Sequence, residues 1–417
     1  MKIAHIGPPR ARQGGPAGYL LQLGEAARRA GAEDRLLLPP LAVRRGAQRP
    51  SPLARVRRGL RHVKRMIAPA PRFYRPSDEV LRADRGHIEG MIAVANAEVV
   101  AQARVSFGRA FAESADVLFC HEPAAAEHAL NRRTGQQVWL MLHSPIPLAL
   151  YLVWNWGVPE RDWQDVMTFP DVQRWTAWEV ALWHSVDRLI IPCRGAFAEI
   201  ARVTPSALPL EPALTYVLSG ASAMNTSPVA DRDSTRRRFG LPLDVPVGLF
   251  LGNQQPYRGL DTLLSAAATL GSDAPAGVIV VAGPQKGAIP STARVRGLGL
   301  VADVASLLAA VDFVINVNRF SLFDLSTIEA LEAGKPLLLH GVGGNIAFEQ
   351  LGAGTVVIDD LQPKTIADGL SLMFAMTPDR RAALAQSSRR CYDAHLTLEK
   401  FWNRHAALYA GAAPARA

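Results

Sequence analysis

The chain has 417 residues, 49% of them hydrophobic and 20% charged, with a formal net charge of +9. This length suits two domains of about 200 residues each, and this apolar content argues against a disordered chain. The three cysteines have no paired spacing, which argues against a disulfide framework or a zinc knuckle and favours a reducing compartment. The N-terminus lacks the apolar run of a signal peptide, and a histidine and two prolines interrupt the apolar stretch 140–156. We therefore expect a soluble, cytoplasmic protein.

The positive charge lies in one segment. Residues 41–75 hold eleven Lys and Arg and no Asp or Glu, and the rest of the chain has 35 basic against 37 acidic residues. Within 53–67, apolar residues recur at helical spacing and basic residues fill the remaining positions. Such a helix either docks on an anionic membrane surface, here the inner face of the membrane, or packs by its apolar stripe with its arginines in solvent. Both interpretations stay open, whereas no binding motif favours nucleic acid.

In chain order, the first predicted strand covers residues 2–6, and a glycine-containing loop leads from it into a leucine-rich helix. The loop contains Gly14 and Gly15. A Gly-Gly turn before a helix lets backbone N–H groups approach an anion, although most such pairs are simple turns. These two residues are therefore candidates for phosphate contact. No GxGxxG motif follows this strand, which disfavours a dehydrogenase.

Two further predicted strands each end in a histidine, His121 after 116–120 and His143 after 138–142. Ligand sites of parallel α/β sheets lie at the carboxyl ends of the strands. A histidine there can hydrogen-bond a sugar hydroxyl or act as an acid or base, because its usual pKa is near neutrality. The alternative is a capping or structural histidine, and of the two we favour His143 for function.

Residues 154–183 hold six of the eight tryptophans. An aromatic face can stack on a sugar ring, and Trp154 is a candidate for contact with a sugar or an acceptor. The more common role of such residues is packing in the core.

The second half begins after a linker at 221–230, which is rich in small and polar residues. A predicted strand at 247–252 is followed by a loop with Arg258 and Gly259, and then by a helix. A guanidinium grips phosphate in a bidentate manner, so Arg258 is a candidate for phosphate binding, the alternative being a solvated loop residue.

The stretch 312–345 is the most informative. It predicts a buried strand at 313–315, a polar loop, and a short helix that begins at Ser326 and stops at Gly334. The start of that helix is a candidate anion site. Ser326 and Glu329 also have the spacing of a capping box, in which Glu329 would bond its own backbone.

These motifs resemble those of the family 4 glycosyltransferases. The run from Glu329 to Pro336 is similar to the family's "EA-x-x-x-GKP" helix, and the two histidine strands are similar to its "HaHdp … tvHg" pattern. The loop around Arg258 resembles "GR-x4-KG", with Arg258 at the lysine position and Asn253 at the arginine position. Ser321 stands where the family has the first glutamate of its Glu-x7-Glu motif.

The resemblance implies an α/β protein of two facing Rossmann-like domains, the GT-B fold, with a cleft between them. It implies an acceptor-side domain at 1–222 plus 399–417 and a nucleotide-sugar domain at 231–398. The C-terminal helix is expected to cross back to the first domain.

The implied activity is transfer of a sugar from a nucleotide-sugar to a hydroxyl of a glycan, lipid-linked or natural-product acceptor, with retention of configuration and without a metal or other cofactor. The implied catalytic residues are His143 and Arg258, with Asp324 as the carboxylate nearest to the missing glutamate. The implied donor-binding residues are Gly14, Gly15, Arg258, Ser326, Glu329 and Leu298. Sugar or acceptor contacts are expected from His121, Ser321 and Trp154.

Two alternatives remain from the sequence. One is another GT-B activity such as a nucleotide-sugar epimerase, although no second acid or base for it can be placed. The other is a weak or inactive relative that binds nucleotide, a glycan or a partner glycosyltransferase, which the changes at Ser321 and Asn253 favour.

Overall fold

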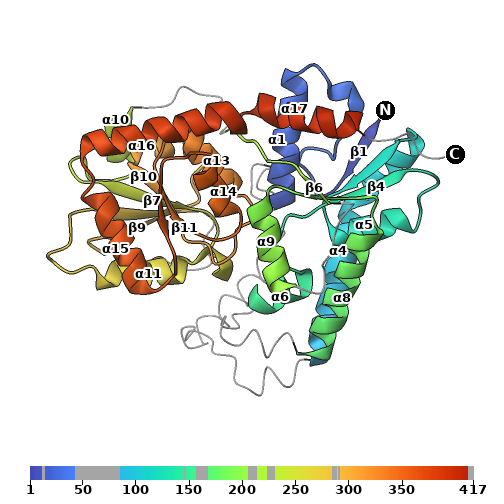
Figure 1. The fold of residues 1–417 in the computed structure, drawn as a ribbon, viewed down its shortest axis with the longest axis horizontal. Coiled ribbons are helices and arrows are strands. Elements are labelled where there is room, and N and C mark those ends of the chain that lie inside the picture. The colour runs from blue at the N-terminus through green and yellow to red at the C-terminus, as the bar shows by residue number, and fades with distance from the viewer. Residues whose placement is uncertain are drawn as a thin grey trace, which may run out of the picture.

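The computed structural model describes residues 1–11, 15–42, 85–144, 146–155, 168–204, 214–222, 231–283, 289 and 292–411. Within this part of the chain, two six-stranded parallel sheets lie side by side with helices on their faces (Figure 1). The predicted basic helix at 53–67 and the loop residue Gly14 lie outside the described residues.

The first sheet has the order β2-β1-β3-β4-β5-β6, and every pairing is parallel. Its central strands are short, apolar and buried, as their sequences predict. The strands are β1 (Ile3–Ile6), β2 (Leu36–Leu37), β3 (Val117–Cys120), β4 (Gln137–Met141), β5 (Arg188–Ile191) and β6 (Leu214–Tyr216). The helices of this half are α1 (Gly15–Arg29), η1 (Glu33–Arg35), α4 (Arg85–Ala112), α5 (Pro123–Leu130), α6 (Leu148–Asn155), α8 (Pro170–Ser185) and α9 (Arg194–Val203).

The second sheet has the order β12-β11-β10-β7-β8-β9, again with parallel pairings. The chain starts in the middle at β7 and reverses direction at β10, so the switch point lies between these two strands. The strands are β7 (Val247–Leu251), β8 (Val278–Ala282), β9 (Val295–Gly299), β10 (Phe313–Asn316), β11 (Leu337–His340) and β12 (Thr355–Ile358). The helices are α10 (Arg232–Arg238), η4 (Pro256–Arg258), α11 (Leu260–Thr269), α12 (Val304–Ala310), α13 (Leu325–Glu332), α14 (Gly344–Gln350) and α15 (Pro363–Phe374).

The last helices run back along both halves (Figure 1). α16 (Pro378–Cys391) continues through a π-helical turn, η5 (Tyr392–Leu396), into α17 (Leu398–Ala410). Apolar residues of α17 such as Phe401 pack with Ile3 and Leu23 of the first half in one core cluster. The predicted return of the C-terminal helix to the first domain is therefore confirmed.

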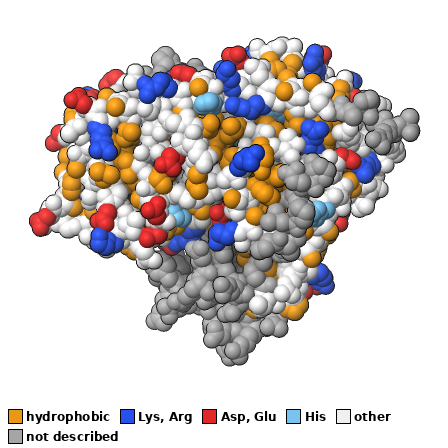
Figure 2. Space-filling view, viewed as in Figure 1, with side chains coloured by type: hydrophobic (Ala, Val, Ile, Leu, Met, Phe, Trp, Pro, Cys, Tyr) orange, Lys and Arg blue, Asp and Glu red, His pale blue; other side chains and the backbone are white. Residues whose placement is uncertain are grey.

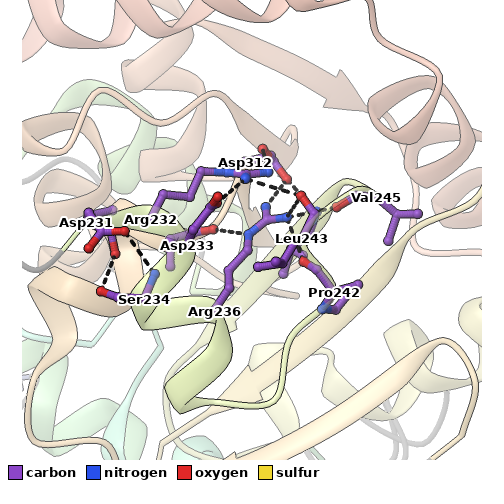
Figure 3. Close-up of polar contacts among 12 residues, drawn as sticks. Asp231, Arg232, Asp233, Ser234, Arg236, Pro242, Leu243, Val245 and Asp312 are labelled. Carbon is purple, nitrogen blue, oxygen red and sulfur yellow. Dashed lines mark hydrogen bonds and ion pairs between the residues drawn. The ribbon is translucent and has the colours of Figure 1, made fainter.

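A buried ion pair stabilises the second sheet at the amino ends of its strands, opposite to the switch-point loops. Arg236 of α10 is fully buried, and its guanidinium bonds Asp312 at 2.6 Å and the carbonyl of Ala310 at 2.8 Å (Figure 3). Asp312 precedes β10 and also accepts a bond from the backbone N–H of Val247 at 2.6 Å. Lys335, the lysine of the "GKP" run, donates nearby to the Val311 carbonyl at 2.9 Å. These cations therefore hold the fold together at the amino ends of the strands.

The described surface is mixed in charge. Figure 2 shows Lys and Arg side chains interspersed with Asp and Glu and separated by apolar patches on one face. Among the helices that the structure describes, none is long and apolar enough to cross a membrane.

Candidate active site

The candidate site lies at the switch point of the second sheet, where β7 and β10 end. After β7 the chain makes a short turn, η4, which places Arg258 over the ends of these strands. Gly259 follows with a left-handed φ of +69°, and a Cβ there would lie 2.1 Å from the Val317 carbonyl oxygen. Only glycine fits this position, and the turn that it allows places Arg258 at the site.

Arg258 is held by an acidic and an amide side chain. Its side chain is only 12% exposed, and it forms an ion pair with Asp324 and a bond to Asn318 Oδ1 at 3.3 Å. Asn318 in turn donates to the Asp324 carboxylate at 2.6 Å. The interpretation of Arg258 as a solvated loop residue is therefore wrong, because its partners fix the guanidinium inside the protein.

A second set of amides braces this pair. Asn316, the last residue of β10, donates to Asp324 at 3.2 Å, to Thr327 at 3.0 Å and to Asn345 at 3.2 Å. Asn345 lies on α14 and also accepts a bond from the Ser321 hydroxyl at 2.8 Å. One asparagine thereby ties the end of β10 to the starts of α13 and α14.

The start of α13 faces the same place. The helix begins at Leu325 with Asp324 as its N-cap residue, and Ser326 and Thr327 line a small pocket together with Arg258 and Asn316. The capping box predicted from Ser326 and Glu329 is wrong, since Ser326 lies inside the first turn. The Asp324 carboxylate makes no capping bond, because it faces Arg258 and the amides instead. The free N–H groups of a first helical turn are a site for anions.

The predicted histidines meet in the first half of the molecule. His121 follows β3 and is buried, and its Nδ1 lies 2.9 Å from Nε2 of His143, which follows β4. Burial lowers the pKa of His143 to about 3 and that of His121 well below its usual range. Both rings are therefore neutral at physiological pH, and they act through hydrogen bonds rather than charge.

The two halves contact each other beside the Ser321–Asp324 loop. Phe320 packs in a cluster with Ile146 and Leu150 of the first half. The Cys193 thiol lies 3.8 Å from the Leu322 carbonyl oxygen, and the Tyr151 and Tyr257 rings are 6.1 Å apart. The loop in place of the family's first glutamate therefore lies against the opposite domain.

Comparison with known proteins agrees with this geometry. Residues 245–375 match the family model described as glycosyl transferases group 1. The D-inositol 3-phosphate glycosyltransferase of Corynebacterium urealyticum is 26% identical over 281 residues, which is 61% of this chain and 63% of that protein. The enzyme of the same name from Mycobacterium avium is 30% identical over 266 residues, 57% of this chain and 58% of that one. The chain thus spans less than two thirds of the length of these relatives.

Solved structures match over nearly the full chain. Anabaena HepE in complex with UDP-glucose superposes with a TM-score of 0.64 at 16% identity, over 99% of this chain and 100% of that one. Sucrose-phosphate synthase from Thermosynechococcus elongatus gives a TM-score of 0.62 at 17% identity, over 98% of each chain. The chain therefore has the GT-B fold, and its second half is similar to the glycosyl transferases group 1.

In this GT-B chain the predicted donor residues fall into two groups. Arg258 and Ser326 line one pocket, and Glu329 lies half-buried one turn further along α13. Leu298 lies in β9 and packs against the core of the second domain, and Gly15 opens α1 with a φ of +69°. Their roles toward a donor stay predictions.

The remaining predicted contacts are less direct. Ser321 is 1% exposed and its hydroxyl already bonds Asn345, so a sugar would reach it only after a rearrangement of the loop. The side chain of Trp154, like Gly14, lies outside the described residues. Asp324 faces Arg258 rather than open space, and its catalytic role stays a prediction.

Sequence reasoning missed the asparagines that brace the site. Asn316 ends β10, Asn318 stands in the polar loop after it, and Asn345 follows a glycine pair 29 residues after Asn316. Polar residues at the ends of two adjacent strands were the available signal, since β10 and β11 are neighbours in the sheet.

Proposed function

We propose that this protein transfers a sugar from a nucleotide-sugar to an acceptor hydroxyl, with retention of configuration and without a required metal. The observation that carries the proposal is the pocket at the switch point. There the Arg258 guanidinium and the first turn of α13 converge on one place. A cation and helix N–H groups are the partners that a departing nucleoside diphosphate needs, because negative charge develops on it as the glycosidic bond breaks.

The other residues would act around this centre. Glu329 would accept hydrogen bonds from the ribose hydroxyls, and backbone N–H groups after Gly15 would approach the diphosphate from the first domain. His143, being neutral, would hydrogen-bond the sugar or the diphosphate rather than carry charge. Because HepE is described in complex with UDP-glucose and UDP, a UDP-sugar is the first donor to test.

The test is a thermal-shift panel of UDP-, GDP- and ADP-sugars on the wild type and on Glu329→Gln. A ligand that binds the folded state raises the melting temperature. We expect one nucleotide class to stabilise the wild type and to stabilise the variant less. If no nucleotide stabilises the wild type, the donor site is refuted. Equal activity with EDTA and with added Mg²⁺ is expected if no metal is required.

A second function has a specific observation in its favour. Asp324 neutralises Arg258, and Ser321, in place of the first glutamate, is buried. A chain of this kind could bind nucleotide without turnover and serve a partner glycosyltransferase. Release of free nucleotide from the stabilising donor, with or without acceptor, separates the two: binding without release over hours selects this alternative.

Peripheral membrane binding through 53–67 belongs to the same proposal. The segment carries six Lys and Arg between its apolar positions, and each would contribute about 1 kcal/mol near anionic headgroups. Flotation with anionic liposomes should be lost when five of the six become Gln: Arg57, Arg58, Arg61, Lys64 and Arg65. Equal flotation of both proteins would reject docking by this segment.

A further inference from the structure

Three histidines of the first domain form one hydrogen-bonded row. His5 of β1, His121 after β3 and His143 after β4 come from adjacent strands of the sheet. His143 Nε2 lies 2.9 Å from His121 Nδ1, and His121 Nε2 lies 2.9 Å from His5 Nδ1. The row ends on the C-terminal helix, where His5 Nε2 lies 3.1 Å from the Tyr409 hydroxyl. A continuous row of four side chains thus joins α17 to the end of β4.

The protons in this row are coupled. His5 and His121 are buried, and burial lowers the pKa of each well below its usual range, so both rings are neutral. A neutral imidazole has one N–H donor and one lone-pair acceptor. Since both nitrogens of His5 and of His121 face a partner, a donor on one side of each ring requires an acceptor on the other. All bonds of the row therefore point the same way.

The Tyr409 hydroxyl decides which way. It is buried, and His5 is the one hydrogen-bond partner that it has among the described residues. If Tyr409 accepted from His5, its own proton would have no acceptor among these residues, and a buried donor without an acceptor is destabilising. If Tyr409 donates, its proton has an acceptor in His5 Nε2, and His5 and His121 each carry their proton on Nδ1.

The neighbouring histidine does not interrupt the row. His405 lies with Nδ1 3.1 Å from the Phe401 carbonyl, which requires an N–H at that nitrogen, so its Nε2 accepts from the Tyr19 hydroxyl at 2.8 Å. The Tyr19 ring packs edge-on against His143 with the centroids 5.1 Å apart. Tyr19 thus restrains the His143 ring by packing while its hydroxyl is used elsewhere.

We propose that Tyr409, His5 and His121 are positioning residues that fix His143 as the Nδ1–H tautomer. His143 Nε2 accepts from His121, so its remaining nitrogen, Nδ1, is a hydrogen-bond donor and has no lone pair with which to act as a base. This step rests on the proposed function: the partner of the N–H is an oxygen of the bound nucleotide-sugar, on its sugar or its diphosphate. Because the N–H is already oriented before the nucleotide-sugar binds, no reorganisation of this hydrogen-bond donor is needed in the transition state.

The test reads the tautomer directly. A long-range ¹H–¹⁵N correlation spectrum of histidine-labelled protein distinguishes protonated from unprotonated ring nitrogens, and the signals lost in His143→Gln assign His143. We expect protonated Nδ1 and unprotonated Nε2 in the wild type, and a loss of this preference in Tyr409→Phe. Tyr392→Phe is the matched control, because Tyr392 is another buried tyrosine whose hydroxyl bonds Ala221 and Glu332, outside the row. A wild-type His143 protonated on Nε2 would overturn the proposal.

A second measurement links the row to function. Tyr409→Phe should weaken donor affinity or turnover about threefold to tenfold, the effect of losing one neutral hydrogen bond, while Tyr392→Phe should not. The spectrum is recorded without a nucleotide-sugar. The tautomer of His143 and the glycosyltransferase activity can therefore be refuted independently of each other. The predicted tautomer without nucleotide binding would refute the glycosyltransferase proposal and leave the row intact. Nucleotide binding together with a His143 protonated on Nε2 would refute the proposal for the row and leave the glycosyltransferase proposal intact.

Discussion

The carboxylate of Asp324 forms an ion pair with the guanidinium of Arg258, so the cation of the candidate donor pocket is already neutralised. An incoming diphosphate would therefore meet a carboxylate beside its cation. Asp324→Asn keeps an oxygen that can accept from Arg258 and Asn318 but removes the negative charge. Repulsion between the Asp324 carboxylate and a diphosphate bound at Arg258 would cost at least about 1 kcal/mol. We therefore expect the variant to bind UDP about tenfold more tightly, as measured by calorimetry.

Asp231→Asn is the control for this change, since Asp231 is also the N-cap residue of a helix but lies at α10. Its affinity for UDP should equal that of the wild type. Weaker binding by Asp324→Asn would mean that the carboxylate serves mainly to hold Arg258 in place.

Removing the arginine tests the same pair from the other side. Arg258→Ala should weaken UDP binding about tenfold to a hundredfold, since a charge-assisted hydrogen bond contributes about 1.5–3 kcal/mol. Arg258→Lys should recover only part of this, because an ammonium lacks the planar fork of a guanidinium. Arg28→Ala, at an exposed ion pair of α1, is the control. UDP affinity unchanged in Arg258→Ala would remove this residue from the donor site.

The folding pattern could be predicted from sequence because buried parallel strands are short apolar runs. Predictions for strands such as 313–315, for the helix return after 398 and for two Rossmann-like halves needed only periodicity, glycine punctuation and family resemblance. The helix start at Ser326 was misplaced by one residue. Its capping signal is local, whereas the Asp324 carboxylate is drawn to Arg258, which is 66 residues away.

The candidate site was less predictable for the same reason. Arg258 and His143 were found because each follows a strand within a recognisable motif. His5 and Asn345 were not, because their roles come from neighbours 116 and 29 residues away in the chain. A single sequence does not reveal which strands are adjacent, and this adjacency creates both networks.

The glycine after the arginine should be as sensitive as the arginine itself. In Gly259→Ala the new Cβ would meet the Val317 carbonyl oxygen at 2.1 Å, and the left-handed φ of +69° would be strained. We expect a loss of at least about 2 kcal/mol of unfolding free energy, because the αL conformation alone costs about 1–2 kcal/mol. UDP affinity should fall as well, because the turn that carries Arg258 must shift.

Gly271→Ala is the matched control, because a Cβ there meets no atom within 4 Å. Urea denaturation of both variants checks the prediction. If the two variants were equally stable, the 256–259 turn would be able to accommodate a Cβ without loss of unfolding free energy, and it would not fix the position of Arg258.

A buried carboxyl of the first domain should make stability fall with rising pH. Glu179 of α8 is 4% exposed and accepts the Leu148 backbone N–H at 2.7 Å. Burial raises its pKa to about 8 and raises that of Glu122 to about 7. The folded state thus binds more protons than the unfolded state above about pH 4.5, so these groups lower stability progressively as pH rises toward 8.

Glu179→Gln keeps an acceptor for Leu148 but cannot ionise. We expect the variant to gain about 3 kcal/mol on the wild type between pH 5 and pH 8 in urea denaturation, with exposed Glu98→Gln as the control. Parallel pH profiles for wild type and Glu179→Gln would show that Glu179 stays ionised in the folded protein.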